Sequence, residues 1–171
     1  MRALRLLALV ALTLASAACR GDRMPPTRAS AIVGAWRSKV EIRSGAFASM
    51  KDLEFLYAFQ AGGTMTESSN YDAAPPVPPA YGVWRQSGEN RFEVRYEFFT
   101  TRAATPEEAA GASGGWLPSG RGVFDETIQV SEDGGTFTSS LRYELFDPAG
   151  KPVDGGGSGE GRGRRLRPPG S

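Results

Sequence analysis

Short segments of alternating hydrophobic and polar residues, separated by turn sequences, are the feature that most constrains the fold of this chain. The clearest segment spans residues 91–98, where charged positions alternate with Phe92, Val94, Tyr96 and Phe98. A period of two is typical of a β-strand with one buried and one solvated face. Gly, Pro, Asn and Asp interrupt such segments at fairly regular intervals. The chain is therefore expected to be all-β.

Eight segments of this kind follow one another along the chain. We expect strands at about residues 32–42, 53–59, 64–70, 81–86, 91–98, 121–130 and 136–145, and a glycine-rich last strand ending near Leu166. Hairpin-length turns between them favour an antiparallel up-and-down barrel, since closure pairs the first strand with the last and removes both exposed edges. A two-sheet sandwich is the alternative, with the proline-rich residues 73–80 as the crossing between sheets.

The N-terminus has the composition of an export signal. Arg2 and Arg5 flank the start of an apolar stretch, residues 6–14, that is too short to cross a bilayer. Residues 1–18 are therefore predicted to be a signal peptide that is removed after export.

Cys19 is the only cysteine in the chain and follows Ser16-Ala17-Ala18. This sequence resembles the lipobox of bacterial lipoproteins, which implies a lipid on Cys19 and a membrane-anchored protein of the cell envelope. Ser16 stands where lipoboxes usually have Leu, and the small residues Ala15 and Ala17 also fit ordinary signal peptidase cleavage. A secreted or periplasmic protein without lipid is the alternative.

The remaining chain is long enough for one domain. Residues 19–29 are predicted to hold the lipidated cysteine and a flexible tether, residues 30–167 the barrel, and residues 168–171 a C-terminal tail. The chain has 20 Lys and Arg against 19 Asp and Glu. This near balance implies no polyanionic partner, and nucleic-acid binding is not expected.

The first predicted strand opens with Gly34-Ala35-Trp36, which resembles the Gly-x-Trp signature of lipocalins and their calycin relatives. Other glycines, and Trp84, fall at predicted turns and strand starts, as in bacterial lipocalin-like domains. The resemblance covers about residues 32–166 and makes Gly34, Trp36 and Trp84 the fold signature. It implies an eight-stranded lipocalin-like barrel and a late arginine packed over Trp36, which would be Arg162, Arg164 or Arg165. Such domains are functionally diverse, so the resemblance indicates a fold more than a function.

In an up-and-down barrel, alternate loops emerge at the same end. The first, third, fifth and seventh loops, about residues 43–52, 71–80, 102–120 and 146–151, are mostly long, whereas the others are short glycine turns. We therefore assign the end with the long loops as the open mouth. The candidates to line it are Phe47, Met50, Tyr71, Tyr81 and Trp116.

The fifth loop contains Thr105-Pro106-Glu107-Glu108. This sequence combines an N-cap, a proline at the first helical position and a capping-box glutamate, and predicts a short helix. The segment is also a candidate lid over the mouth.

The absence of histidine from the sequence narrows the possible chemistry. It excludes the usual Ser-His-Asp and Cys-His sites, and histidine-built zinc or haem sites. We predict no cofactor and no metal. Glu126 shares its parity with Phe124, Ile128 and Val130, so we expect it inside the barrel, with a raised pKa unless an arginine pairs with it. Asp125 should point to the opposite face.

The favoured function is non-catalytic binding of a small hydrophobic or aromatic ligand inside the barrel. The candidate binding residues are Phe55, Tyr57, Phe59, Phe92, Tyr96, Phe98, Leu141, Tyr143, Glu126 and Trp116. A hollow interior would need small inward residues, which Ser139, Ala58 or the late glycines could supply. The alternative is a filled barrel that serves as a structural or interaction module of the envelope. An isomerase- or cyclase-like enzyme with Glu126 as its acid ranks third.

Overall fold

The structure is a computed structural model that describes residues 31–71, 78–109 and 115–170. The predicted signal peptide, the lipidation at Cys19 and the tether lie outside these residues. Most of the proline-rich segment considered as a crossing also lies outside them.

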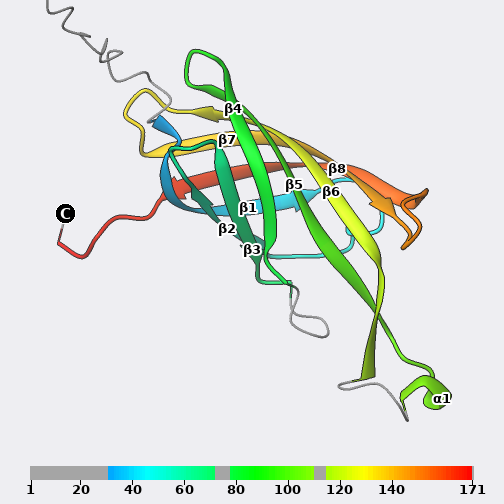
Figure 1. Ribbon diagram of the computed structural model, residues 1–171. Coiled ribbons are helices and arrows are strands. Elements are labelled where there is room, and N and C mark those ends of the chain that lie inside the picture. The colour runs from blue at the N-terminus through cyan, green and yellow to red at the C-terminus, as the bar shows by residue number, and fades with distance from the viewer. Residues whose placement is uncertain (1–30, 72–77, 110–114, 171) are drawn as a thin grey trace, which may run out of the picture.

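Within the described residues, eight strands form one closed barrel in which each strand is antiparallel to the next and the last pairs with the first (Figure 1). The strands are β1 Gly34–Ile42, β2 Leu53–Phe59, β3 Thr64–Ser69, β4 Ala80–Gly88, β5 Arg91–Ala103, β6 Trp116–Val130, β7 Thr136–Phe146 and β8 Pro152–Arg165. This confirms the all-β, up-and-down architecture. The sandwich alternative is wrong, because β1 and β8 are hydrogen-bonded neighbours.

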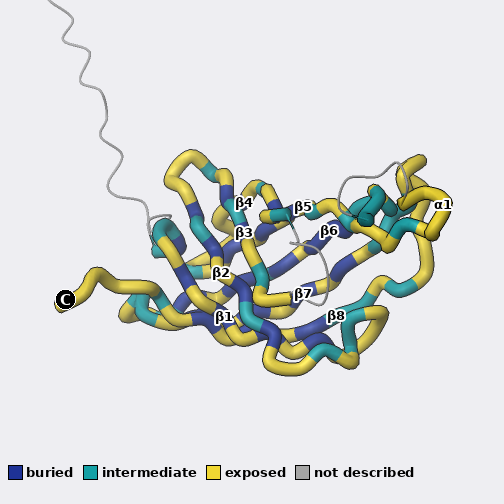
Figure 2. The backbone as a smooth tube through the Cα atoms, turned by 90° about the horizontal axis from the view of Figure 1, so that it is seen from below, coloured by how far each residue is buried: buried dark blue, intermediate teal, exposed yellow. Residues whose placement is uncertain are grey.

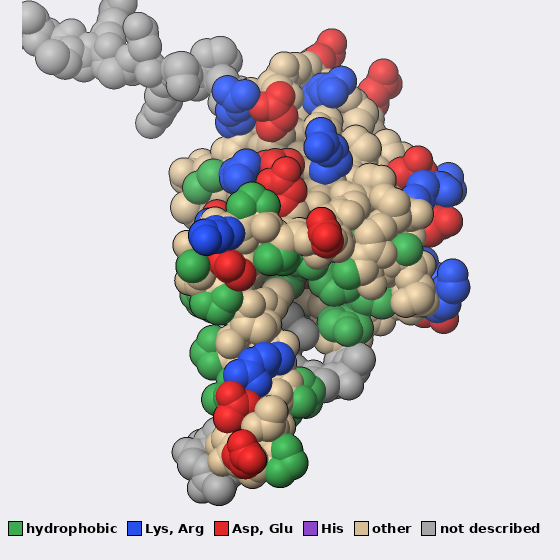
Figure 3. Space-filling view, turned by 90° about the vertical axis from the view of Figure 1, so that its right-hand side faces the viewer, with side chains coloured by type: hydrophobic (Ala, Val, Ile, Leu, Met, Phe, Trp, Pro, Cys, Tyr) green, Lys and Arg blue, Asp and Glu red, His purple; other side chains and the backbone are tan. Residues whose placement is uncertain are grey.

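Strands β5 and β6 extend furthest beyond the lengths that the sequence predicted. Strands β5 and β6 were expected to end near Phe98 and to begin near Arg121, but they stay paired out to Ala103 and Trp116. A register shift between Thr100 and Thr101 lets the ladder continue. The extra length forms a two-stranded arm that projects beyond the barrel, and hydrophobic side chains gather on it (Figures 1 and 3).

The predicted helix in the fifth loop is confirmed as α1, Pro106–Ala109. Its capping box is formed: the Thr105 backbone N–H donates to Glu108 Oε2 at 2.9 Å, and the Glu108 N–H donates to Thr105 Oγ1 at 3.4 Å. Arg102 also donates to Glu108 at 2.8 Å. The helix sits at the end of the arm, away from the barrel body (Figure 1).

Inward and outward residues alternate along the strands (Figure 2). In β5, Phe92, Val94 and Tyr96 are buried, whereas the intervening Arg91, Glu93 and Arg95 are exposed. The same alternation in the other strands places large aromatic and aliphatic side chains in one continuous core. Side chains therefore fill the interior of this small barrel, as its strand number allows.

The late glycines serve this packing. Gly159, Gly161 and Gly163 lie buried on the inner face of β8. A Cβ on Gly163 would lie 2.1 Å from the Phe137 ring, and one on Gly161 would lie 2.5 Å from Ser139 Oγ. The space that these glycines leave is thus occupied by side chains of β7. Ala58 alternates with the buried Tyr57 and Phe59, so it lies on the outer face and opens no interior space.

Arg165 covers Trp36 at the end of the barrel opposite the arm. Its guanidinium carbon lies 4.2 Å from the ring centroid of Trp36, and Arg165 donates to the carbonyls of Val33 and Gly134 at 2.7 and 2.8 Å. Trp36 is fully buried and donates its own N–H to the Ile32 carbonyl at 2.7 Å. The structure thereby selects Arg165 from the three candidates, because Arg162 and Arg164 are exposed.

Replacing Arg165 with Met should lower the free energy of unfolding by about 2–4 kcal/mol. The substitution removes a cation–π contact and several charge-assisted hydrogen bonds to partly buried carbonyls. Urea unfolding would measure the change. Arg164→Met, at the neighbouring exposed position, is the control and should shift stability by less than about 0.5 kcal/mol. Equal effects of the two substitutions would contradict a closing role for Arg165.

Gly163→Ala should destabilise the barrel by about 1–3 kcal/mol, because the Phe137 ring must leave its position to admit a methyl group. Thermal or urea unfolding would detect the loss. Gly62→Ala is the matched control, since a Cβ there meets nothing within 4 Å. An unchanged stability of Gly163→Ala would show that the interior has room to spare next to β8.

Candidate functional site

The interior contains two buried carboxyl groups, Glu67 and Glu126, whose exposed fractions are 6% and 3%. Each lies on a strand whose alternation turns it inward. Glu67 shares the inner face of β3 with buried Met65, and Glu126 shares the inner face of β6 with Phe124 and Ile128. The predicted interior position of Glu126 is therefore found. Asp125 points outward, where it forms an ion pair with Arg95 at 3.0 Å.

Glu126 is held by two tyrosines. The hydroxyls of Tyr57, on β2 across the barrel, and of Tyr96, on the neighbouring strand β5, donate to its Oε2 at 3.1 and 3.2 Å. Its Oε1 is buried and has no hydrogen-bond partner among the described residues. Burial raises the pKa of Glu126, and the nearby hydroxyls of Ser139, Tyr57 and Tyr96 oppose this rise only in part. Burial also raises the pKa of both tyrosines well above the usual value, so they remain neutral donors.

Glu67 has a different environment. Its Oε1 is buried and has no hydrogen-bond partner among the described residues. Burial, reinforced by the negative charge of Glu126, raises the pKa of Glu67 to about 8. Glu67 is thus largely protonated at neutral pH, and it is an interior acid whose hydrogen-bonding capacity is not used within the fold.

Glu67 lines a cavity of about 40 Å³ at the mouth of the barrel. The cavity is otherwise mostly apolar and lies between the ends of the strands and the first and third loops. Its lining residues are Ile42, Phe47, Met50, Leu53, Phe55, Glu67, Ser69, Tyr71, Pro78, Phe98 and Phe124. This volume corresponds to about three water molecules, so the cavity accepts a small group and not a whole drug-sized molecule.

The first loop is fixed over this cavity by Tyr143. The Tyr143 hydroxyl accepts from the Phe47 N–H and donates to the Ser44 carbonyl, both at 3.1 Å. The rings of Phe47 and Tyr143 stack with centroids 5.1 Å apart. The wall that Phe47 provides is therefore preorganised by the barrel, which reduces the entropic cost of binding there.

The residues predicted from the sequence to bind a ligand separate into three groups. Phe55 and Phe98 line the mouth cavity, together with the predicted mouth residues Phe47, Met50 and Tyr71. The remaining interior candidates are packed into the filled core or, for Glu126, held beside it: Tyr57, Phe59, Phe92, Tyr96, Leu141, Tyr143 and Glu126.

The third group lies away from the cavity. Trp116 is at the far end of the arm, where it pairs with Ala103. Tyr81 lies on the outer face of β4 and is 66% exposed. Neither residue lines the mouth cavity.

Glu67 was missed by sequence reasoning. Its strand is short and polar, with Thr66 and Ser68 on one face and only Met65 as a strongly apolar residue on the other. The available signal was parity: Glu67 lies two residues after Met65, as Glu126 lies two residues after Phe124.

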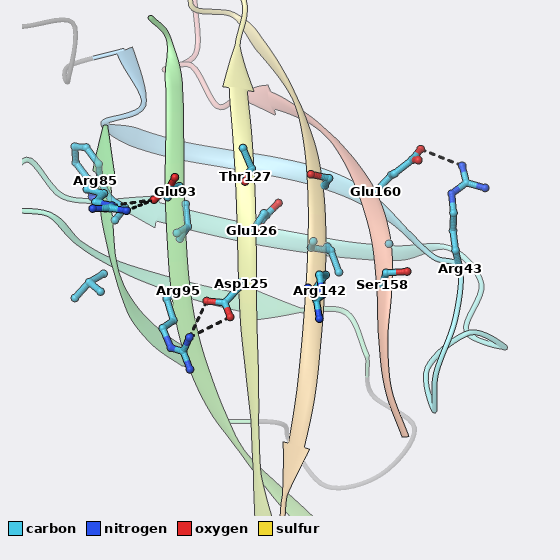
Figure 4. Close-up of a pocket in the computed structure, with 16 residues that line it drawn as sticks. Arg43, Arg85, Glu93, Arg95, Asp125, Glu126, Thr127, Arg142, Ser158 and Glu160 are labelled. Atoms are coloured by element: carbon cyan, nitrogen blue, oxygen red, sulfur yellow. Dashed lines mark hydrogen bonds and ion pairs between the residues drawn. The ribbon is translucent and has the colours of Figure 1, made fainter. Parts of the chain in front are cut away.

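A larger hollow, of about 720 Å³, lies on the outer surface over β4 to β8 (Figure 4). Its outward side chains include ion pairs between Arg85 and Glu93 and between Arg95 and Asp125, with Arg43 and Glu160 at the other side. These groups are paired and exposed. Such pairs typically contribute about 0–1 kcal/mol. We assign this hollow to the curvature of a solvated sheet and not to a ligand site.

Other kinds of site are not found in the described part of the chain. No group of three or more carboxylate, His or Cys side chains is arranged to hold a metal ion there. Over the same residues, no helix has both the length and the apolar character needed to cross a bilayer.

No family model matches this chain, and no curated protein matches it either. The closed eight-stranded antiparallel barrel is compatible with the lipocalin-like fold that the sequence motifs resemble. The geometry of the mouth cavity is therefore the basis on which a function can be inferred.

The stability of the protein should fall as the pH rises from about 5 to 8, because the folded state binds the Glu67 proton more tightly than the unfolded chain does. The slope attributable to Glu67 should be up to about 1.4 kcal/mol per pH unit. Glu67→Gln should remove this part of the slope and should be more stable than the wild type at pH 8. Urea unfolding at pH 5, 6, 7 and 8 measures it.

Glu93→Gln, which removes an exposed carboxyl on β5, is the control for this measurement. It should keep the steep decrease in stability of the wild type. A Glu67→Gln protein with the same slope as wild type would refute the assignment of that proton to Glu67.

Proposed function

We propose that the protein binds a small, largely apolar ligand at the mouth of its barrel, and that binding and not catalysis is its role. The observation that carries this proposal is the aromatic mouth cavity with a buried, unpartnered carboxyl among its lining residues. Concave apolar sites with one well-placed polar group are typical of small-molecule binding sites.

The proposed site differs in position from the one expected from the sequence. The aromatic interior below the mouth is occupied by its own side chains: Tyr57 stacks on Phe59 with centroids 5.6 Å apart, and Tyr96 stacks on Phe124 at 5.1 Å. A ligand would therefore insert one small group beside Glu67, while the rest of the molecule stays at the opening.

The second candidate, a filled barrel acting as an interaction module, is favoured by one observation. Phe99 is 70% exposed on the outer face of β5, where the arm begins. Exposed aromatic side chains are enriched at protein interfaces. The enzyme alternative has less support, because Glu126 is buried below the mouth and does not line the cavity.

We also propose that the protein is exported and anchored to the cell envelope through Cys19. The support comes from the sequence of residues 1–19. In the barrel, the first and last strands meet at Trp36 and Arg165, at the end away from the mouth loops. A tether that enters at this end would point the mouth away from the membrane.

Binding at the mouth is tested with benzyl alcohol as a neutral aromatic probe. The probe should shift the amide NMR signals of residues that line the cavity, such as Phe47 and Phe98, in a saturable manner. Ser69→Leu places a larger side chain at the cavity and should weaken binding at least tenfold. Ser68→Leu is the matched control, since Ser68 is exposed on the other face of β3, and it should bind as the wild type does. The absence of saturable shifts in the wild type would favour the interaction module.

A further inference from the structure

We infer that the mouth cavity is a binding site for the ammonium group of a small organic amine, with Glu67 as its counter-ion. This inference rests on the proposed binding function and names the chemical class of its ligand. It is carried by the geometry of the lining: one carboxyl without a partner, surrounded by aromatic rings, with no basic side chain among the lining residues.

The aromatic rings provide the first part of the argument. Five rings line the cavity, from Phe47, Phe55, Tyr71, Phe98 and Phe124. They come from the first and third loops and from strands on different sides of the barrel, so they surround the space.

The same rings are close enough to act together. The centroids of Phe47 and Tyr71 are 6.1 Å apart, those of Phe55 and Phe124 are 5.9 Å apart, and those of Phe98 and Phe124 are 5.6 Å apart. Aromatic faces carry negative potential and attract desolvated cations. A group of such rings favours a cation over a neutral group of the same size.

The carboxyl provides the second part. The exposed fraction of Glu67 is 6%, and its Oε1 has no hydrogen-bond partner among the described residues. A buried carboxylate is stable only when it is paired, so Glu67 stays largely protonated at neutral pH while the cavity is empty. Among the described lining residues there is no Lys or Arg to pair with the ionised form, and a cationic ligand would supply that partner. An anionic ligand would not, because it would repel the ionised carboxylate.

The size of the cavity gives the third part. A space of about 40 Å³ accepts a primary ammonium with one or two carbons of its stem. Met50, Leu53 and Pro78 line the same cavity and suit the apolar part of such a molecule. The expected ligand is therefore an amine with an apolar or aromatic body.

Binding should depend on pH, because the amine replaces the proton of Glu67. The titratable groups that face Glu67 are Tyr57 opposite it on β2, Glu126 on β6, Tyr96 on β5 and Tyr71 at the third loop. Its other neighbour, on β4, is Ala80, which does not titrate. Burial raises the pKa of Glu67 to about 8 and also raises the pKa of Glu126, so the Glu67→Gln variant is needed to assign the pH dependence to Glu67.

The test compares benzylammonium with benzyl alcohol, which has nearly the same shape without the charge. Both are titrated into the full-length protein at pH 8 and pH 6, with dissociation constants measured by amide NMR shifts. We expect benzylammonium to bind at least tenfold more tightly than benzyl alcohol at pH 8. This preference should fall at least tenfold at pH 6, where Glu67 is protonated and the amine is still charged.

Glu67→Gln keeps the size and polarity of the side chain and removes its charge. We expect the ratio of the two dissociation constants to show no preference for benzylammonium in this variant at either pH value. Glu54→Gln is the matched control. Glu54 lies on β2, next to β3, and its side chain is paired with Arg37 at 3.8 Å on the outer surface. This variant should keep the wild-type preference.

The possible outcomes separate the ammonium inference from the proposed binding function. Equal binding of benzylammonium and benzyl alcohol would overturn the ammonium inference and leave the proposed binding function standing. Binding of neither probe would overturn both. A preference for benzylammonium that survives in Glu67→Gln would show that the aromatic rings alone select the cation, and it would overturn the role of Glu67 as counter-ion.

Discussion

Closure of the sheet between β1 and β8 is the constraint on which the rest of the structure depends. The pairing runs from Trp36 opposite Arg165 to Ile42 opposite Gly159, and it leaves no free edge in the barrel wall. An eight-stranded barrel encloses only enough space for side chains. The inner face of β8 is therefore built of glycines, which allows Phe137 and Ser139 of β7 to occupy the space that side chains on β8 would need.

A filled interior determines where the polar groups must lie. Glu126 is deep in the barrel and is stabilised by two tyrosine hydroxyls, which is the usual way to compensate a buried acid. Glu67 lines the mouth cavity, and its Oε1 is buried without a hydrogen-bond partner among the described residues. The Oε1 of Glu126 also lacks a partner, but it lies in the filled core and does not line this cavity. An unsatisfied carboxyl oxygen and vacant volume therefore coincide at the mouth.

The sequence was sufficient for the features that follow from alternation within one strand. The alternation in β5 predicted the buried row that begins at Phe92, and the parity of Glu126 predicted its burial. Features that depend on the packing between strands could not be obtained in this way. The choice of Arg165 requires the register of β8 against β1, and the filling of the interior requires the contacts of its glycines with β7. Glu67 stands out because of the residues from other strands and loops that surround it. The sequence of its own short polar strand does not reveal these neighbours.

The unpaired acid at the mouth links stability to binding. Burial without a partner raises the pKa of Glu67 to about 8, which means that the fold favours the neutral form and loses stability when the group ionises. A cation that enters the cavity reverses this balance, because it stabilises the ionised form in the folded protein alone. A charged ligand can offset part of the free energy that the barrel loses when Glu67 ionises, whereas a neutral ligand cannot. A glutamine at this position would avoid the cost of a buried carboxyl at pH 8, so folding stability alone does not account for Glu67, whereas the proposed recognition of an amine does.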